Sequence, residues 1–462
     1  MRALLTDLYQ LTMVYGYWKT GLYSREAVFH LNFRRWPFQG GFALAAGLET
    51  AVEFLEDFRF LPEDLAYLES LKLFDPKFLE FLGEFEFACD VDAMPEGTLV
   101  FPYEPILRVK GPLWQAQLLE SPMLNLINFQ TLISTKAARV CLAAHPDPVI
   151  EFGMRRAQGV DGAISASRAA YIGGCVATSD VIAGQKFGIP VRGTHAHSWI
   201  MAFDTERESF EAFADVMPKG CILLVDTYDS LEGVKNAIAV AKKKKGFVLE
   251  GVRLDSGDLA DLSIAAREIL DLEGFPDAKI MASNELDEYL IADLKQQGAK
   301  ISLWGVGTNL VTGKDQPALD GVYKLSAIQD AKGEWVHKIK LSEQMARVTN
   351  PGILQVRRFR EGDVIYDELL GIEEPCTAVA IQDPHQQKIL GKGQDLLVPI
   401  FRRGKLVYPF PLLEAVQAHA KKELALLPAA MKRFTLPQLY FAGMEKKLYE
   451  KKLKLIKRMS TK

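Results

Sequence analysis

The chain has 462 residues, of which 48% are hydrophobic and 25% are charged, the composition of an ordinary globular protein of about two or three domains. The net charge is −4 at pH 7, which gives no electrostatic reason to expect a nucleic-acid partner. No window approaches the ~20 uninterrupted apolar residues that cross a bilayer, and the first ten residues do not resemble a signal peptide. We expect a cytoplasmic protein with neither a membrane nor a nucleic acid as partner.

The five cysteines are scattered and contain no C-x-x-C pair. This spacing predicts neither a disulfide framework nor a zinc site, and reduced thiols are expected. The cysteines are Cys89, Cys141, Cys175, Cys221 and Cys376.

The first 140 residues predict a mixed α+β domain. Apolar residues at helical spacing favour a helix over 6–20, and alternation favours a strand over 27–33. Turn residues divide 91–109 into short antiparallel strands, and a Ser-Pro start predicts a helix from 121 to about 140.

From about 141 to 330 the pattern changes to strand followed by helix, which predicts a parallel sheet with helical crossovers. Several apolar runs break into polar residues at the same end, as in Val225-Asp226 and Leu254-Asp255. Functional groups at the carboxyl ends of parallel strands are typical of an α/β (TIM-like) barrel enzyme. We expect Asn284 to cap a helix, and the Lys242–Lys245 run to be a helix end rather than a polyanion site.

After about 330 the alternation stops. Residues 338–341, 353–359 and 364–366 are predicted strands, and we expect residues 330–400 to complete the N-terminal α+β domain. A helical extension is predicted over 401–462. Its last helix should pack through one apolar face, the face that carries Tyr449, Leu453 and Ile456.

The stretch from Pro190 to Ser198 is the strongest candidate for a site. On an extended backbone, His195 and His197 point to one side, beside Thr194 and Ser198. Either imidazole could act as a base, a metal ligand or a nucleophile. The alternative is a structural histidine at the end of a strand.

Two arginines, Arg155 and Arg253, follow strand ends, where a guanidinium can bind a carboxylate or a phosphate. The alternative is an ion pair at the barrel mouth. The loop from Gly305 to Thr308 could cradle a phosphate, or be only a tight turn. The carboxylates around Asp255 suit Mg²⁺ or sugar hydroxyls, although Asp-Ser before a helix is also an ordinary cap. These features together predict an anionic, phosphorylated substrate, which could bind together with Mg²⁺.

Six motifs also resemble the nicotinate phosphoribosyltransferase family, in order and up to about residue 370. They are Leu5–Gln10, the Phe33-Arg34-Arg35 strand end with its Gly-Gly loop, Glu151–Gly159, Gly193-Thr194 with Ala196-His197-Ser198, Gly251–Asp258, and Gly305–Thr308 followed by Gly321–Leu325. The resemblance implies the barrel of the type II phosphoribosyltransferases. It implies ATP-dependent ligation of nicotinate with 5-phosphoribosyl 1-pyrophosphate (PRPP) to nicotinate mononucleotide and pyrophosphate, the first step of NAD salvage from nicotinate.

The same resemblance implies roles for individual residues. The phosphorylated histidine falls on His197, and Asp255 is a catalytic carboxylate toward the ribose or Mg²⁺; His195 receives no role. Mg²⁺ as cofactor, ATP as cosubstrate, and a homodimer with its site at the subunit interface are further implications. Nicotinate binding carries over to Tyr9, Thr194, Arg253, Arg155 and Ser198, and PRPP binding to Thr308, Gly307, Gly305 and Ser283.

Three alternatives stay open from the sequence. A nicotinamide phosphoribosyltransferase has the same fold and donor but a neutral acceptor, and the Gly193–Ser198 pattern favours nicotinate over it. A quinolinate phosphoribosyltransferase would need more cationic contacts for its second carboxylate. A barrel without catalysis, acting as a binding protein, would have little reason to keep His197, Arg155, Arg253 and Thr308 together.

Overall fold

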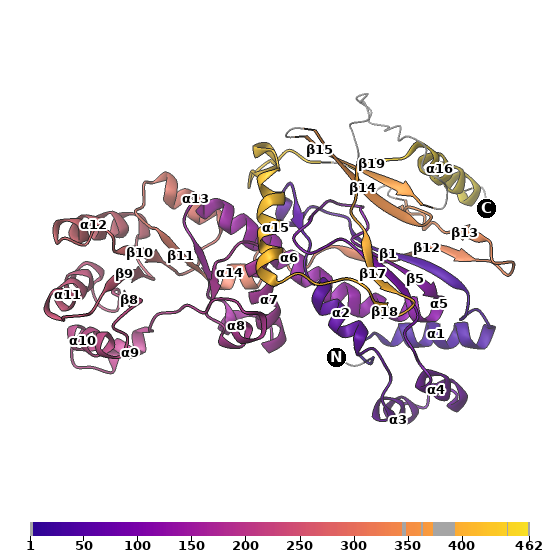
Figure 1. Cartoon of the computed structure of the whole chain (residues 1–462), viewed down its shortest axis with the longest axis horizontal. Coiled ribbons are helices and arrows are strands. Elements are labelled where there is room, and N and C mark those ends of the chain that lie inside the picture. Colours follow the sequence, from indigo (N-terminus) through magenta and orange to yellow (C-terminus); the bar gives the residue numbers. More distant parts are fainter. Residues whose placement is uncertain (1–2, 344–347, 362–363, 373–392, 441, 461–462) are drawn as a thin grey trace. The chain divides into compact units, whose positions relative to one another are not determined.

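Six parallel strands form the centre of residues 133–317 (Figure 1). The computed structural model describes residues 3–343, 348–361, 364–372, 393–440 and 442–460. These fall into two units, which we call unit 1 (Met1–Leu132 with Ala318–Lys462) and unit 2 (Ile133–Pro317). No helix in the described part of the chain is long and apolar enough to span a bilayer.

The sheet of unit 2 has the strand order β7-β6-β11-β10-β9-β8, and every recorded pair is parallel. Because the first strand, β6, pairs with the last, β11, the chain order runs around the sheet, which is barrel topology. The predicted α/β barrel is therefore confirmed. The elements of unit 2 are β6 (Val149–Glu151), η2 (Met154–Arg156), α7 (Val160–Ile172), β7 (Ala177–Thr178), α8 (Val181–Phe187), α9 (His197–Met201), α10 (Glu206–Val216), β8 (Cys221–Leu224), α11 (Ser230–Lys243), β9 (Leu249–Leu254), α12 (Leu259–Leu272), β10 (Lys279–Ala282), α13 (Glu288–Gln296), β11 (Leu303–Val306) and α14 (Thr308–Val311).

The barrel is open along one line, which we call the seam. Beyond β7, a single parallel bridge joins Thr178 to Val191. Among the described residues, no backbone ladder then connects the segment 190–197 to β8. The seam therefore lies between the segment with the two candidate histidines and the strand that leads to Asp226.

Aspartates begin four of the outer helices of unit 2. Asp180, Asp229, Asp258 and Asp287 each accept backbone N–H groups in the first turn of α8, α11, α12 and α13. Such caps satisfy donors that a helix start leaves unpaired. Asp258 is therefore a helix cap, which leaves Asp255 as the carboxylate of its motif that is available for chemistry. The predicted cap at Asn284 is wrong, because Asp287 takes that position.

The lysine run at the end of α11 is held by carboxylates of unit 2. Lys242 Nζ lies 2.5 Å from Glu273 Oε2, Lys243 Nζ 3.0 Å from Glu211 Oε1, and Lys244 Nζ 2.5 Å from Asp215 Oδ1. The prediction of a helix end is confirmed. In the described part of the chain, Cys89, Cys141, Cys175 and Cys221 form no disulfide, and Cys376 lies outside the described residues.

Unit 1 is built on a seven-stranded sheet of order β13-β12-β1-β5-β3-β17-β18 whose recorded pairs are antiparallel. The late strands β12 and β17 pair with the early strands β1 and β3, so the end of the chain completes the sheet that its beginning starts. β12 lies in this sheet, although the sequence interpretation extended the barrel to about residue 330. The elements are α1 (Leu8–Thr20), β1 (Glu26–Phe33), η1 (Pro37–Gln39), β2 (Ala43–Leu44), α2 (Leu48–Glu56), α3 (Pro62–Ser70), α4 (Pro76–Gly83), β3 (Asp90–Ala93), β4 (Leu99–Val100), β5 (Leu107–Pro112), α5 (Leu113–Leu118), α6 (Glu120–Ala144, which continues into unit 2), β12 (Gly321–Gln329), β13 (Trp335–His337), β14 (Leu354–Glu361), β15 (Val364–Gly371), β16 (Gln394–Asp395), β17 (Val398–Arg402), β18 (Lys405–Leu406), α15 (Leu413–Ala425), η4 (Ala429–Lys432), β19 (Gly443–Met444) and α16 (Lys446–Ser460).

Two predictions in the C-terminal part need correction. The strand expected at 338–341 is instead β13, which ends at His337. In α16 the buried residue is Leu448, whereas Tyr449 and Leu453 of the predicted packing face are 41% and 43% exposed. The helix does pack through one face, but it is rotated from the predicted one. Between the predicted strands 353–359 and 364–366, residues 362 and 363 lie outside the described residues.

A buried ionic network joins β14, β15 and α15 in unit 1. Arg358 donates from Nε to Asp367 Oδ1 at 2.8 Å and from Nη2 to Asp367 Oδ2 at 2.6 Å. Its Nη1 donates to Glu423 Oε2 at 2.8 Å, and its Nη2 also reaches the carbonyl oxygen of Leu99 at 2.8 Å. The side chains of Arg358 and Asp367 are completely buried, so neither charge can exchange its partner for water.

We predict that Arg358→Met lowers the free energy of unfolding by about 3–5 kcal/mol, because it leaves the buried carboxylate of Asp367 without its cation and removes one of the two arginines that pair with Glu423. Chemical denaturation followed by circular dichroism measures this loss. Lys235→Ala is the matched control, since Lys235 forms an exposed pair with Glu232, and it should leave the unfolding midpoint unchanged. Equal midpoints for Arg358→Met and the parent chain would contradict the prediction.

Candidate active site

One pocket of about 360 Å³ lies at the carboxyl ends of the unit 2 strands. This is the edge of a barrel sheet where binding sites are built, and the volume suits a small ligand. Eight sequence-predicted site residues line it: Arg155, Thr194, Arg253, Asp255, Ser283, Gly305, Gly307 and Thr308.

Arg253, at the end of β9, connects three strand ends within this pocket. Its Nε donates to Ser283 Oγ at 2.8 Å, its Nη1 to Thr194 Oγ1 at 2.9 Å, and its Nη2 to Asp255 Oδ1 at 2.9 Å. A guanidinium carries five N–H groups, so these bonds leave one N–H on each terminal nitrogen. The predicted alternative of an ion pair at the barrel mouth is thus also present, because Arg253 pairs with Asp255.

The wall beside Arg253 is the ring of Phe152, which follows β6. The guanidinium carbon lies 5.5 Å from the ring centre, within the range of a cation–π contact. Gly305 makes this approach possible, since a Cβ atom there would lie 2.7 Å from Phe152 Cδ2 and from Met281 Cε. Gly305 is therefore required by packing, whatever its contacts to a ligand.

His197 is the first residue of α9 and lies next to the pocket lining rather than in it. Its Nε2 is 3.2 Å from Oδ1 of Asp226, whose side chain is fully buried. A carboxylate can only accept, so Nε2 carries the proton, and in the neutral ring Nδ1 keeps the lone pair. Asp226 Oδ2 accepts from the backbone N–H of Asp255 at 3.0 Å and from Ser256 Oγ at 2.5 Å. The carboxylate of Asp226 thus fixes His197 to the strand end that carries Arg253.

The other predicted residues are less closely connected. Arg155 is exposed on η2 and lines the pocket, and it forms no ion pair within the part of the chain that the structure describes. Thr308 begins α14, with Gly307 before it. Ser198 is exposed on α9, outside the pocket lining. Tyr9 belongs to unit 1, where α1 leaves it 48% exposed; partial burial and the charge of Glu120 raise the pKa of its hydroxyl.

Asn284 follows β10 at the pocket with a φ of 100°, a backbone conformation that is strained for a residue with a side chain. Such residues are frequent at ligand sites and need support from their surroundings. Its neighbour Ser283 supplies that support, since Ser283 is 3% exposed and its hydroxyl bonds to both Arg253 and Asp255.

A protein-only metal site does not fit these residues. In the described part of the chain, no group of three or more His, Cys, Asp or Glu side chains could hold a metal ion. Asp255 Oδ1 already accepts from Arg253 and Ser283. Mg²⁺ commonly binds through substrate phosphates together with one or two carboxylates, so a magnesium ion would have to arrive with phosphate oxygens.

His195 lines the pocket but is 8% exposed. Its Nε2 accepts the backbone N–H of Leu224, the last residue of β8, at 3.3 Å, and its ring packs at 4.7 Å edge-on against Phe213 of α10. Burial lowers the pKa of His195 to about 4, and the positive charge of Arg253 acts in the same direction. The ring is therefore neutral at pH 7, with its proton on Nδ1.

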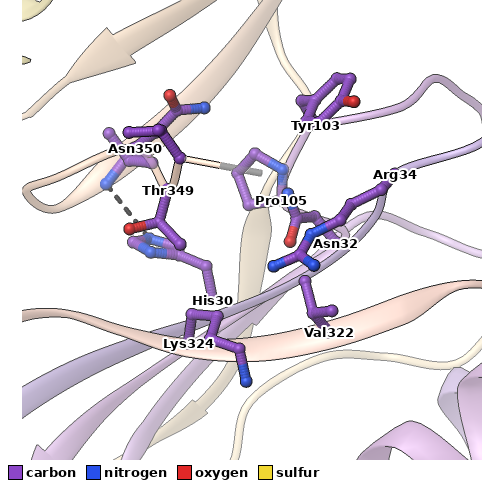
Figure 2. Close-up of a pocket in the computed structure, with 11 residues that line it drawn as sticks. His30, Asn32, Arg34, Tyr103, Pro105, Val322, Lys324, Thr349 and Asn350 are labelled. Atoms are coloured by element: carbon purple, nitrogen blue, oxygen red, sulfur yellow. Dashed lines mark hydrogen bonds between the residues drawn. The ribbon is translucent and has the colours of Figure 1, made fainter. Parts of the chain in front are cut away.

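A second pocket, in unit 1, is too small for a substrate (Figure 2). It holds about 30 Å³, roughly the room for a single water. The backbone N–H of Leu354 donates to Nε2 of His30 at 3.3 Å. The position of His30 in the pocket is shown in Figure 2. Arg34, from the predicted Phe33-Arg34-Arg35 strand end, lines it with Lys324, whereas Arg35 pairs with Asp320 at 3.0 Å.

Sequence reasoning assigned no role to Phe152 or to Asp226. Asp226 could have been found, because it follows an apolar strand in the same way as Asp255 does. Phe152 carries no such signal, since an aromatic residue after a strand is usually part of a core.

The comparisons with known proteins agree with this architecture. Family models match over most of the chain: the nicotinate phosphoribosyltransferase N-terminal domain at residues 4–128, the nicotinate phosphoribosyltransferase family at 148–341, and its C-terminal domain at 363–452. The nicotinate phosphoribosyltransferase of Bacillus subtilis is 43% identical over 469 residues, covering 98% of this chain and 95% of the relative. That of Bos taurus is 35% identical and covers 97% and 95%. The crystal structure of human nicotinic acid phosphoribosyltransferase has a TM-score of 0.84 at 32% identity, covering 98% and 99%.

The open barrel, with its polar pocket at the strand ends and its likeness to the human structure, defines a type II phosphoribosyltransferase fold. The chain belongs to the nicotinate phosphoribosyltransferase family, and it is an enzyme.

We predict that His195 makes stability depend on pH. The unfolded chain takes up a proton near the ordinary pKa of 6.5, and the folded chain only near 4, so the contribution is complete above pH 6.5 and is lost as the pH falls toward 4. The difference, 6.5 − 4, is worth roughly 3 kcal/mol at most. Denaturant unfolding at pH 7, 5 and 4 should show a smaller decline for His195→Gln than for the parent chain. Burial also lowers the pKa of His30, but His30 is present in both chains and adds the same decline to each. Equal declines in the variant and the parent chain would therefore contradict the assignment to His195.

Proposed function

We propose that the enzyme joins nicotinate to PRPP, giving nicotinate mononucleotide and pyrophosphate, and that ATP drives the reaction through phosphorylation of His197. The observation that carries the proposal is the guanidinium of Arg253, held by Thr194, Ser283 and Asp255 with one N–H of each terminal nitrogen left over. A planar fork of this kind matches a carboxylate, the group that distinguishes nicotinate from nicotinamide.

The acceptor ring lies against Phe152 in this proposal. With the carboxylate on Arg253, an aromatic wall next to the guanidinium keeps the ring plane fixed. Ser198 and Arg155 remain candidates for contacts to the carboxylate or ring.

The phosphoribosyl donor occupies the end of the pocket between η2 and α14. Arg155 and the exposed Arg156 bring positive charge, and Gly307 and Thr308, at the start of α14, line the same pocket. The pyridine nitrogen attacks the anomeric carbon, the C–N bond forms, and the bond to the pyrophosphate oxygen breaks. No proton moves in this step, so the enzyme contributes position and charge rather than a general base.

His197 acts as a nucleophile toward ATP. Its Nδ1 lone pair attacks the γ-phosphorus, the bond to the β-phosphate oxygen breaks, and ADP leaves. The ring gains a positive charge as the N–P bond forms, and the buried carboxylate of Asp226, 3.2 Å from Nε2, opposes that charge. Water later cleaves the N–P bond to release phosphate and regenerate the imidazole. Magnesium would accompany the phosphates of both substrates, with Asp255 as a carboxylate close to the ribose.

A homodimer with the site at the subunit interface is also proposed. Tyr9 belongs to unit 1 whereas the pocket lies in unit 2, and the exposed ring of Tyr9 is available to a second chain.

The test is product formation from PRPP with nicotinate or nicotinamide, each with and without Mg-ATP. We expect nicotinate mononucleotide, formed faster with ATP, and at least about 10-fold less product from nicotinamide. Arg253→Lys keeps the charge but loses the fork, so it should raise the KM for nicotinate more than the KM for PRPP. Preference for nicotinamide would overturn the acceptor site, and absence of both products would favour a barrel without catalysis.

We predict that His197→Ala abolishes the stimulation by ATP but keeps slow ATP-independent synthesis, because the pocket that positions donor and acceptor is intact. The measurement is transfer of labelled γ-phosphate to the protein, together with the synthesis rate with and without ATP. Met201→Ala, at a position of the same helix that is 67% exposed, serves as a control that keeps the imidazole. A labelled phosphoenzyme in His197→Ala would refute the assignment.

A further inference from the structure

Two histidine side chains form hydrogen bonds across the seam of the barrel, and both bonds span the same sequence separation. His195 Nε2 accepts from the backbone of Leu224, and His197 Nε2 bonds to Oδ1 of Asp226. In each pair the partner lies 29 residues later in the chain. The segment 195–197 therefore runs alongside 224–226 in parallel register, with side chains in place of ladder hydrogen bonds.

Within the described residues, no backbone ladder sets the register of this segment against β8. The last recorded ladder bonds on its near side are those of Thr178 N to Pro190 O and of Arg192 N to Thr178 O, both at 3.0 Å. The next strand, β8, has its recorded ladder with β9 on the opposite side. From residue 193 to the start of α9 the segment thus depends on side chains to fix its distance from β8.

The imidazole of His195 is suited to that task. It is nine-tenths buried, and the rings of Phe213 and Phe210 of α10 flank it at 4.7 and 6.2 Å. A backbone N–H can only donate, so the bond to Leu224 requires an unprotonated Nε2. His195 Nε2 is therefore a fixed acceptor for the last backbone N–H of β8, that of Leu224, which lies two residues before Asp226.

We infer that His195 is a positioning residue, which sets the register of residues 195–197 against β8 and so holds His197 at Asp226, whereas Thr194 is held separately by its bond from Arg253. This inference rests on the proposed function insofar as it concerns phosphorylation of His197. It goes further in giving the buried histidine a task in the ATP-coupled half of the reaction, separate from the contacts of Arg253 in the acceptor pocket.

Three substitutions of His195 distinguish the contribution of its hydrogen-bond acceptor from that of its ring packing. His195→Gln places an amide oxygen near the position of Nε2, so it keeps the bond to Leu224. His195→Phe keeps the ring packing against Phe213 but has no acceptor. His195→Asn is shorter and does not reach Leu224; it replaces the Phe variant as the loss variant if that chain does not fold. Phe213→Leu, as a matched control, removes a ring contact and leaves the acceptor.

The first readout is the rate at which labelled γ-phosphate of ATP is transferred to the protein, beside the rate of ATP-independent synthesis. We expect His195→Phe and His195→Asn to slow phosphorylation about 10-fold or more, while ATP-independent synthesis stays within about threefold. His195→Gln and Phe213→Leu should phosphorylate within about threefold of the parent chain. A merely structural role would lower both reactions together and would not be rescued by glutamine.

The second readout needs no activity. In protein labelled with ¹⁵N-histidine, the ring nitrogens of His197, identified by their loss in His197→Ala, should show the proton on Nε2 in the parent chain and in His195→Gln. In His195→Phe that single tautomer should give way to a mixture. If the parent chain forms no phosphoenzyme, the proposed function fails, and the tautomer still decides the inference. An unchanged tautomer in His195→Phe, or phosphorylation of that variant at the parent rate, overturns it.

Discussion

The three hydrogen bonds of Arg253 are the constraint on which the active-site geometry depends. Thr194, Asp255 and Ser283 each come from a different strand end, and the guanidinium joins them in one plane. Each bond satisfies a buried or half-buried polar group that would otherwise need water. The pocket therefore has its polar groups in place before a ligand binds, and little ordering of side chains remains for binding itself.

Each unit contains an arginine whose guanidinium joins neighbouring strands through hydrogen bonds, but the two networks have different roles. In unit 1, Arg358 and Asp367 are fully buried, and four bonds to groups within the protein use four of the five N–H groups of Arg358. In unit 2, Arg253 keeps N–H groups over and faces a pocket. A fully buried network specifies packing, whereas one that faces a pocket with N–H groups left over can recognise a ligand.

Much of the architecture could be predicted from the sequence, because strand and helix leave different hydrophobic periods and aspartate caps mark helix starts. The polar residues that follow β8 and β9 could be recognised for the same reason, because they end apolar runs. What the sequence could not reveal depends on contacts between distant segments. The face of α16 that carries Leu448 is buried rather than the one that carries Tyr449, because a sheet decides which side of a short amphipathic helix is covered. The pairing of His197 with Asp226 likewise exists only across the seam.

The open seam also has a consequence for motion. A closed barrel must break several adjacent backbone bonds to widen, and such ladders open together. Here, in the described part of the chain, the recorded contacts between segment 195–197 and the end of β8 are two hydrogen bonds made by imidazoles. At about 1 kcal/mol for each such bond, a local opening costs far less than global unfolding. The barrel can thus open locally at the edge of its pocket while the ladders of the other strands stay intact. This is the edge where substrates must enter and a mononucleotide must leave.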